Sequence, residues 1–578
     1  MPFFVPSLKS SRKYLPLSFE LQTVDQLESV LYPLVDRPLS DDASFHQWIQ
    51  DWNEVVCCVL EEMAKRYIDS TCDTRDEAKQ KAYEFIIQSI LPVFSLTTEK
   101  LHQKLLAFPG LSELEKKTEW HILIRNIRTA TELFREENIP LQTEISTLAQ
   151  QFGVINGEMS IEWEGQALTL QQAARLMKNK DRNLRENAWR KMTERRLQDS
   201  QRLDDLMDQL LQRRHQEALQ AGFENYAVYK FKELGRFDYT LQDCFTFHDS
   251  VEKVITPINQ QLLQERAAIL NLTRTRPWDL AVELYSDTPL HPFSNGKELA
   301  DKGIEIFGLL SPDLGEMLNV LKTMGHLDLD SRQGKAPGGY NYPLAETGVP
   351  FIFMNAAGSD HDVATLMHEG GHAIHSLVTH SLPLQAFKET PSEIAELASM
   401  SMEFLTRKYW SVFYPNPREL NVALIEHLLD ALSTVTWIAT IDAFQHWMYT
   451  HPGHTSTQRD EAWRNLYYRF QGKFTDWTDL DKSLDKLWQK QLHLYEVPFY
   501  YIEYGFAQLG ALAIWKRFQE NPEQTISDYL NALRLGYTRT IPEVYAAAGI
   551  RFDFSQAYIQ ELMQYGLAEY RKLATQLS

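Results

Sequence analysis

Two histidines four residues apart are the first feature of this sequence that could carry chemistry. His368 and His372 lie in the run Leu-Met-His-Glu-Gly-Gly-His at residues 366–372. On a helix, residues four apart project from one face, so both imidazoles can bind the same metal ion. Glu369 is offset by about 100° on that helix, close enough to reach a water on the ion without being a ligand. In this arrangement zinc acidifies a water molecule and a carboxylate accepts its proton.

The residues around this motif indicate a mostly buried helix. Apolar side chains flank it on both sides: Leu366, Met367, Ala373, Ile374 and Leu377. Buried imidazoles need polar partners, and a metal ion supplies one. Two consecutive glycines, Gly370 and Gly371, each cost about 1 kcal/mol in a helix relative to alanine. We interpret them as positions where another element or a substrate approaches the bare backbone closely.

A catalytic zinc ion usually has three protein ligands, so a third residue is expected. Thr390, Pro391 and Glu393 are typical of a helix start, as N-cap, first-turn residue and closing residue of a capping box. Glu396 lies one turn further on among apolar residues, where an unpaired carboxylate would be costly. We therefore predict Glu396 as the third ligand. Glu403, on the same face, is either an acceptor for a ligand histidine or a salt-bridge partner.

Several short segments occur in an order that is typical of one protein family. The motif at 368–372 is followed, 24 residues after its second histidine, by the segment 396–403. Four further segments of the same kind are residues 222–226, 335–340, 350–355 and 498–504. The set resembles the zinc oligopeptidases of the thimet oligopeptidase and oligoendopeptidase F group, and it is closest to the oligoendopeptidase F branch. The resemblance spans about residue 180 to the C-terminus and is loose in the N-terminal part.

The resemblance implies a mainly α-helical, two-lobed, zincin-type metallopeptidase. In such a molecule one zinc ion lies at the bottom of a deep central channel, with a small β-sheet beside the zinc helix. The channel would admit short unfolded peptides and exclude folded proteins. The resemblance assigns zinc to His368, His372 and Glu396 and the role of general base to Glu369. It assigns substrate and transition-state contacts to His493, Tyr500, Tyr501 and Tyr504.

The chemistry of peptide hydrolysis supports a role for that C-terminal group. The tetrahedral intermediate carries an oxyanion that needs donors beside the metal, and tyrosine hydroxyls or a histidine N–H can supply them. If the segment after Pro498 is helical, Tyr500 and Tyr504 share a face and Tyr501 lies beside them. The alternative is an aromatic stripe of the core. The spacing from His493 differs from the thimet oligopeptidase pattern, so which hydroxyl faces the oxyanion stays open.

Most of the remaining sequence predicts helices. Apolar residues recur at three- and four-residue spacing over 203–221 before Gly222, a good helix stop, and residues 48–90 contain no proline or glycine. We place a boundary near 170–180. It separates a helical N-terminal region, residues 1–175, from a catalytic domain, residues 176–578.

One predicted exception to the helices lies just before that boundary. Apolar and polar residues alternate over residues 154–169 around Asn156 and Gly157. This pattern predicts a small hairpin with its turn at the Asn-Gly pair.

The second exception precedes the zinc helix. Residues 336–358 predict a loop containing Gly338 and Gly339, followed by one apolar strand. The strand, at 351–354, could bind an extended peptide by edge pairing. The glycine loop could fold over that peptide as a lid.

Charge and composition exclude some partners. The chain has 578 residues with 78 acids against 58 bases, a formal net charge of -20. This acidic balance argues against nucleic acid and against anionic lipid. The longest nearly apolar stretch, residues 504–515, is about half the length needed to cross a bilayer.

Cysteine usage and the start of the chain favour a cytoplasmic protein. Four cysteines without a CxxC pair indicate buried thiols in a reducing compartment: Cys57, Cys58, Cys72 and Cys244. The apolar start, residues 1–6, is too short for a signal-peptide core, and Pro6 interrupts it.

The main hypothesis is therefore a zinc endopeptidase that hydrolyses short unfolded oligopeptides. One alternative is an exopeptidase of the dipeptidyl carboxypeptidase type, which needs a group that holds the substrate's C-terminal carboxylate. Another is a catalytically idle peptide-binding protein on the same fold, although pure binding would not require Glu369 beside the metal. The sequence leaves open the subsite preferences, the oligomeric state and the identity of the metal in the cell.

Overall fold

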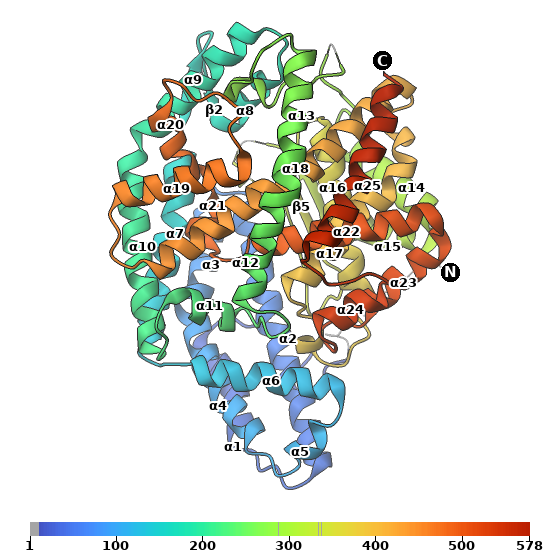
Figure 1. Cartoon of the computed structure of the whole chain (residues 1–578). Helices are drawn as coiled ribbons and strands as arrows, with labels where there is room; N and C mark the ends of the chain where they lie inside the picture. The colour runs from blue at the N-terminus through green and yellow to red at the C-terminus, as the bar shows by residue number, and fades with distance from the viewer. Residues whose placement is uncertain (1–10, 287, 333, 337, 578) are drawn as a thin grey trace. The chain divides into compact units, whose positions relative to one another are not determined.

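The computed structural model describes residues 11–286, 288–332, 334–336 and 338–577, and these residues are mainly helical (Figure 1). The apolar start at residues 1–6 and Pro337 lie outside the described residues. The chain forms two compact units. The first unit takes in the described parts of Met1–Glu136, His291–Leu420 and Gly510–Phe552. The second takes in those of Glu137–Leu290, Asn421–Leu509 and Asp553–Ser578. The organisation into residues 1–175 and 176–578 stays a prediction.

The helices of the first unit are α1 (Val24–Asp36), α2 (Asp42–Cys72), α3 (Glu77–Phe85), α4 (Leu91–Leu106), α5 (Leu111–Leu114), α6 (Thr118–Leu133), α14 (Gly296–Leu310), α15 (Pro312–Thr323), α16 (Asp360–Val378), α17 (Ser392–Thr406), α23 (Pro522–Arg534) and α24 (Ile541–Ala547). A cluster of buried side chains from α1, α2, α4 and α6 forms one apolar core of this unit. The helical prediction for residues 48–90 is confirmed, apart from a short break between α2 and α3.

The helices of the second unit are α7 (Asn138–Gly157), α8 (Leu170–Ala174), α9 (Arg182–Gln198), α10 (Ser200–Gln220), α11 (Tyr226–Glu233), α12 (Leu241–Ser250), α13 (Thr256–Ile269), α19 (Ser456–Gln471), α20 (Asp481–Asp485), α21 (Leu492–Glu496) and α25 (Gln556–Thr575). Two helices, α18 (Pro417–Thr450) and α22 (Ile502–Glu520), begin in one unit and end in the other. The prediction that Gly222 ends α10 is confirmed: its φ is 90°, a conformation that glycine adopts without strain.

The predicted small hairpin exists, but its turn is elsewhere. Strand β1 (Ser160–Trp163) pairs antiparallel with β2 (Gln166–Thr169), so the turn is Glu164-Gly165, with φ values of 51° and 80°. The prediction of a turn at Asn156-Gly157 is wrong, because α7 continues through Gly157.

A three-stranded sheet lies in the first unit. Its order is β3 (Leu327–Asp330), β5 (Phe351–Ala356) and β4 (Tyr340–Tyr342), with β3 parallel and β4 antiparallel to β5. The predicted strand is therefore β5, and α16 packs against it (Figure 1). The prediction that β5 offers an edge to a peptide is wrong, because both of its sides are already paired. Among the described residues, β4 is an edge strand of this sheet.

Helix α18 is long and apolar enough by composition to cross a membrane, and the described residues hold no second helix of this kind. Of its most apolar stretch, 56% is buried inside the structure. The helix also buries polar residues such as Asp442 and Gln445. The core helix of a soluble protein has these same properties, so α18 is weak evidence for a membrane span.

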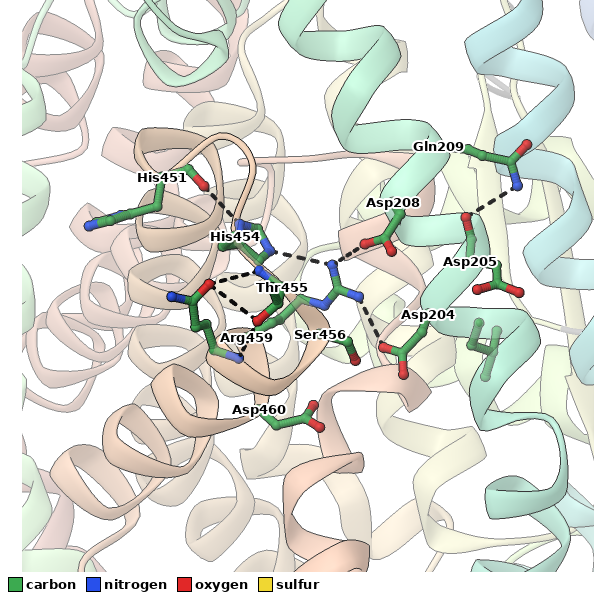
Figure 2. A network of polar contacts seen from close by, with 12 residues as sticks. Asp204, Asp205, Asp208, Gln209, His451, His454, Thr455, Ser456, Arg459 and Asp460 are labelled. Carbon is green, nitrogen blue, oxygen red and sulfur yellow. Dashed lines mark hydrogen bonds and ion pairs between the residues drawn. The ribbon is translucent and has the colours of Figure 1, made fainter.

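A network of ion pairs around the buried Arg459 joins α10 to α19 in the second unit (Figure 2). Arg459 is fully buried, and its two terminal nitrogens lie 3.1 Å from Oδ1 of Asp204 and 2.6 Å from Oδ1 of Asp208. Lys486 reaches the other oxygen of Asp204 at 2.7 Å. A buried charge is tolerated when its partners are fixed in this way. The network holds in place a helix, α10, that supports part of the site described below.

Candidate metal centre and aromatic cluster

The three predicted metal ligands come together between α16 and α17. Nε2 of His368 lies 3.3 Å from Oε2 of Glu396, and Nε2 of His372 lies 3.6 Å from the same oxygen. The three ligand atoms all lie within 4.8 Å of one another. Atoms bound tetrahedrally to zinc at about 2.0–2.1 Å lie about 3.3–3.4 Å apart. The spacing of these atoms therefore fits a zinc ion.

The two glycines of the motif allow the backbone of α17 and the ring of Phe307 to approach α16 closely. A Cβ at Gly371 would lie 2.6 Å from Cα of Ser399 and 2.7 Å from the carbonyl oxygen of Ala398, both on α17. A Cβ at Gly370 would lie 2.4 Å from the ring of Phe307. The interpretation of both glycines as points of close approach is confirmed. Contact at Gly371 is what brings Glu396 within reach of the histidines.

The start of α17 differs from the prediction. The N-cap residue is Pro391, and no side chain caps the helix, so the predicted capping box of Thr390 and Glu393 is wrong. The carbonyl of Pro391 instead accepts the first two helical hydrogen bonds. Tyrosines from the last segment of the first unit hold α17: Tyr545 donates to the carbonyl of Glu393 at 3.1 Å, and Tyr529 donates to that of Ala398 at 2.7 Å.

Glu403 orients one of the ligand histidines. Its Oε1 lies 2.7 Å from Nδ1 of His368. A carboxylate accepts hydrogen bonds, so Nδ1–H donates to Glu403, and Nε2 is the nitrogen that could bind a metal ion. Of the two roles left open for Glu403, this contact favours the acceptor for a ligand histidine.

We expect Glu403→Ala to lower the affinity for zinc by about 10- to 100-fold, because His368 loses the acceptor that fixes its ring. Competition with a metal chelator measures this change. Glu403→Gln should lose less, since its amide oxygen still accepts the Nδ1–H. Unchanged affinity in the alanine variant would contradict a role for Glu403 in orienting His368.

The charges of the centre suit a divalent cation. Burial opposes protonation of His368, yet Glu396 and Glu403 raise its pKa well above the ordinary value. Burial likewise opposes ionisation of Glu396, yet His372 and His368 lower its pKa well below the usual range. A metal ion would replace the proton that this ligand set attracts.

Glu369 follows His368 on α16 and is not one of the three residues whose candidate ligand atoms lie together. Its side chain is buried, burial raises its pKa, and its Oε2 has no hydrogen-bond partner among the described residues. Such an atom needs a partner, and a water molecule would supply it. The role of Glu369 as general base stays a prediction.

For Gly339 the sequence predicts only a place in a lid, and for Asn355 it predicts no role. A Cβ at Gly339 would lie 3.9 Å from Oε1 of Glu369 and 3.4 Å from the carbonyl oxygen of Phe353. Nδ2 of Asn355 donates to the carbonyls of Ala336 and Gly338 at 2.7 and 2.8 Å. Asn355 thus holds the glycine loop beside the sheet. The glycine pair was a signal for this close packing.

The four predicted substrate-contacting residues gather in the second unit. The ring of His493 lies 6.2, 4.7 and 5.9 Å from the rings of Tyr500, Tyr501 and Tyr504, respectively. Only Tyr504 belongs to α22, so the expectation that Tyr500 and Tyr504 share a helical face is wrong. Their rings nevertheless lie 5.4 Å apart. All four side chains are only partly buried, which argues against a simple core stripe.

A chain of hydrogen bonds fixes the tautomer of His493. Nε1 of Trp437 donates to Oε1 of Gln491 at 3.0 Å. This places the amide nitrogen of Gln491 2.8 Å from Nδ1 of His493. An amide NH2 group only donates, so Nδ1 accepts and the proton of the neutral ring is on Nε2. Burial raises the pKa of Tyr501 to about 12, so its hydroxyl stays protonated. Nε2 of His493 and the hydroxyl of Tyr501 are thus two hydrogen-bond donors of the cluster.

A helical fold with a His-His-Glu group on two packed helices defines a metallopeptidase type of site. The sequence model of Peptidase family M3 matches residues 175–564, and that of the Peptidase M3 N-terminal domain matches residues 16–134. The chain therefore belongs to peptidase family M3.

Curated relatives agree on the branch of that family. Oligopeptidase PepF of Bacillus subtilis (strain 168) is 23% identical over 52% of this chain and 45% of its own length. The chromosomal oligoendopeptidase F of Lactococcus lactis subsp. cremoris is 24% identical over 55% and 52%, respectively. The matched stretch thus spans about half the length of these relatives. Their names support the oligoendopeptidase F branch, as the resemblance predicted.

Solved structures extend the similarity to nearly the whole chain. A crystal structure described as an oligoendopeptidase F has a TM-score of 0.90 at 26% identity, over 97% of this chain and 98% of that one. PZ peptidase A with an inhibitor has a TM-score of 0.90 at 25% identity, over 98% and 99%. The predicted mainly α-helical fold with a small sheet beside α16 is confirmed.

Proposed function

We propose that this protein is a zinc-dependent endopeptidase that hydrolyses short unfolded oligopeptides. The observation that carries this proposal is the convergence of His368, His372 and Glu396 at distances that fit zinc, with the buried carboxylate of Glu369 beside them. One zinc ion per chain, when bound there, supplies a Lewis acid and lowers the pKa of a water molecule.

The other residues of the centre and the aromatic cluster have separate roles in the proposed reaction. Glu369 accepts a proton from the attacking water and later delivers it to the leaving amine. Glu403 keeps His368 in the tautomer that leaves Nε2 free of a proton. One or more of His493, Tyr500, Tyr501 and Tyr504 donate to the oxyanion of the tetrahedral intermediate.

The sheet offers a place for an extended peptide. Strand β4 is an edge strand, and Gly339 just before it packs against Glu369. A peptide paired with β4 would bring its backbone past the general base, with main-chain hydrogen bonds that do not depend on side-chain identity. The deep channel that the resemblance implies would restrict such peptides to short, unfolded ones. We propose a cytoplasmic location and peptide substrates as the partners, and no nucleic acid or membrane.

We expect removal of the metal by a chelator to abolish cleavage of a quenched fluorogenic peptide. Adding back about one equivalent of Zn²⁺ should restore it, since three protein ligands hold a single ion. Metal analysis and initial rates before and after dialysis measure both effects. Full activity in protein shown to be free of metal would refute the proposal.

The position of the cleaved peptide bond distinguishes an endopeptidase from an exopeptidase. Peptides of graded length with free and blocked C-termini should all be cut internally if the enzyme is an endopeptidase. Mass spectrometry of the products identifies the bonds. Release of dipeptides from free C-termini, and none from blocked ones, would favour a dipeptidyl carboxypeptidase. Metal and peptide binding without any cleavage would favour the idle binding protein.

A further inference from the structure

The turn before the aromatic cluster has an unusual backbone. Phe499 has a φ of 65°. Only three other non-glycine residues in the described part of the chain have a positive φ. This left-handed conformation is unfavourable for a bulky aromatic residue. It persists only where the surroundings enforce it, and Tyr500 and Tyr501 follow directly. The contacts that enforce it are therefore of interest.

Two buried side chains form hydrogen bonds with the backbone of Phe499. Oε1 of Gln445, on α18, accepts the backbone N–H of Phe499 at 2.6 Å. Nη2 of Arg236, which follows α11, donates to the backbone carbonyl of Phe499 and to Oε1 of Glu503, the latter at 2.8 Å. Phe499 is 1% exposed, Gln445 0% and Arg236 4%. In so dry a setting a lost hydrogen bond cannot be replaced by water.

The ring of Phe499 is held as firmly as its backbone. It lies 5.0 Å from the ring of His446 and 5.3 Å from that of Tyr449, both on α18. A second buried arginine, Arg214 on α10, donates to the hydroxyl of Tyr449 at 2.8 Å. Arg214 also donates to the carbonyl of Leu494 at 3.1 Å. Buried arginines thus bind the backbone on both sides of the turn.

Between these anchors lie the members of the aromatic cluster. His493 precedes the carbonyl that Arg214 binds, and Tyr500 and Tyr501 follow the carbonyl that Arg236 binds. Tyr504 is adjacent in sequence to Glu503, the ion-pair partner of Arg236. The mutual placement of the four rings therefore depends on the conformation of Phe499.

We propose that Gln445 and Arg236 are positioning residues for hydrolysis: by holding Phe499 in its left-handed conformation, they set the hydroxyls of the tyrosines around His493 for the oxyanion. Neither residue needs to touch the substrate. The proposal rests on the proposed function of the aromatic cluster. A purely structural role for the two residues is the alternative, and it predicts different kinetics.

The test compares two substitutions at Gln445. Gln445→Met removes the acceptor at nearly constant length, whereas Gln445→Glu keeps an oxygen at the same place. We expect the methionine variant to lose about 10- to 100-fold in kcat, with KM within about twofold and zinc content unchanged, because a displacement of about 1 Å is enough for such a loss. The glutamate variant should keep most of the activity. A loss confined to KM, or equal in both variants, would overturn the proposal.

A second variant covers the case in which the methionine protein does not fold. Gln445→Asn keeps the amide but shortens its reach by about 1.5 Å, and it should show the same loss in kcat. Thermal melting of each variant establishes that it is folded. An asparagine variant with wild-type kcat would overturn the proposal whatever the methionine variant does.

A double-mutant cycle separates this proposal from the proposed function. Tyr500→Phe, Tyr501→Phe and Tyr504→Phe are first measured alone, and at least one should lower kcat. Gln445→Met in that background should add little, since it acts through the hydroxyl already removed. If no tyrosine variant loses activity, the role of the tyrosine hydroxyls fails, and the positioning proposal fails with it. If one does but the losses multiply, the positioning role fails while the proposed function stands.

Discussion

Glu369→Gln should retain about one zinc per chain and lose about three or more powers of ten in kcat. Glutamine has the shape of glutamate but cannot accept the proton of the attacking water at neutral pH. The ligands His368, His372 and Glu396 keep their contacts, because Glu369 makes none of these. Metal analysis and the rate of cleavage of a quenched fluorogenic peptide measure the two quantities.

A matched control uses a glutamate away from the site. Glu77, on α3 of the same unit, is 87% exposed, so Glu77→Gln should leave both zinc content and rate unchanged. Equal rates for Glu369→Gln and the wild type would refute the mechanism. Loss of the metal together with the activity would instead show that Glu369 supports the ligands.

Gly371→Ala should destabilise the fold by about 1–3 kcal/mol, the usual cost of overpacking a core, and weaken zinc binding. The new methyl group meets backbone atoms of Ser399 and Ala398 at 2.6–2.7 Å, and backbone cannot rotate away as a side chain can. Helix α17 must therefore move, and Glu396 moves with it, away from the two histidines. Denaturant unfolding and chelator competition measure the two effects.

Gly153→Ala is the control for this change. Gly153 also lies within a helix, α7, but a Cβ there meets no atom within 4 Å. The change should be neutral or stabilise the protein by about 1 kcal/mol, because alanine favours helix more than glycine does. Similar effects for the two substitutions would show that helix propensity, and not the contact with α17, determines the result.

The sequence could predict that His368, His372 and Glu396 lie together, because much of the relevant information is local. Helical periodicity places His368 and His372 on one face, and Glu396 stands out because an unpaired carboxylate among apolar residues is costly. The glycine pair indicated close packing for the same reason, since a glycine inside a helix needs an explanation. Functional groups that lie close together in the sequence can therefore be predicted from the sequence alone.

Two predictions were wrong because the same short sequence pattern occurs in two different local structures. An Asn-Gly pair favours a hairpin turn, but glycine also occurs near the end of a helix, and Gly157 is the last residue of α7. A threonine before a proline resembles an N-cap, yet the N-cap is one residue later, at Pro391, and the helix starts at Ser392. Such positions are decided by what the flanking segments pack against.

Contacts between distant parts of the chain could not be predicted. The pairing of β5 on both sides depends on strands from separate segments. Phe499 is bound by Gln445, 54 residues away, and by Arg236, 263 residues away. Neither residue belongs to a motif, so no pattern in the sequence connects them.

The tyrosines that bind α17 are synthesised much later than α17 itself, and this affects when the first unit can fold. A ribosome completes α16 and α17 long before it reaches Tyr529 and Tyr545, which bind the carbonyls of Ala398 and Glu393. The whole segment Asn421–Leu509 of the other unit is synthesised in between. The first unit therefore cannot finish folding as a nascent chain grows. The helix that carries Glu396 gains this support only late in translation, after the histidines of α16 and Glu396 itself have been made.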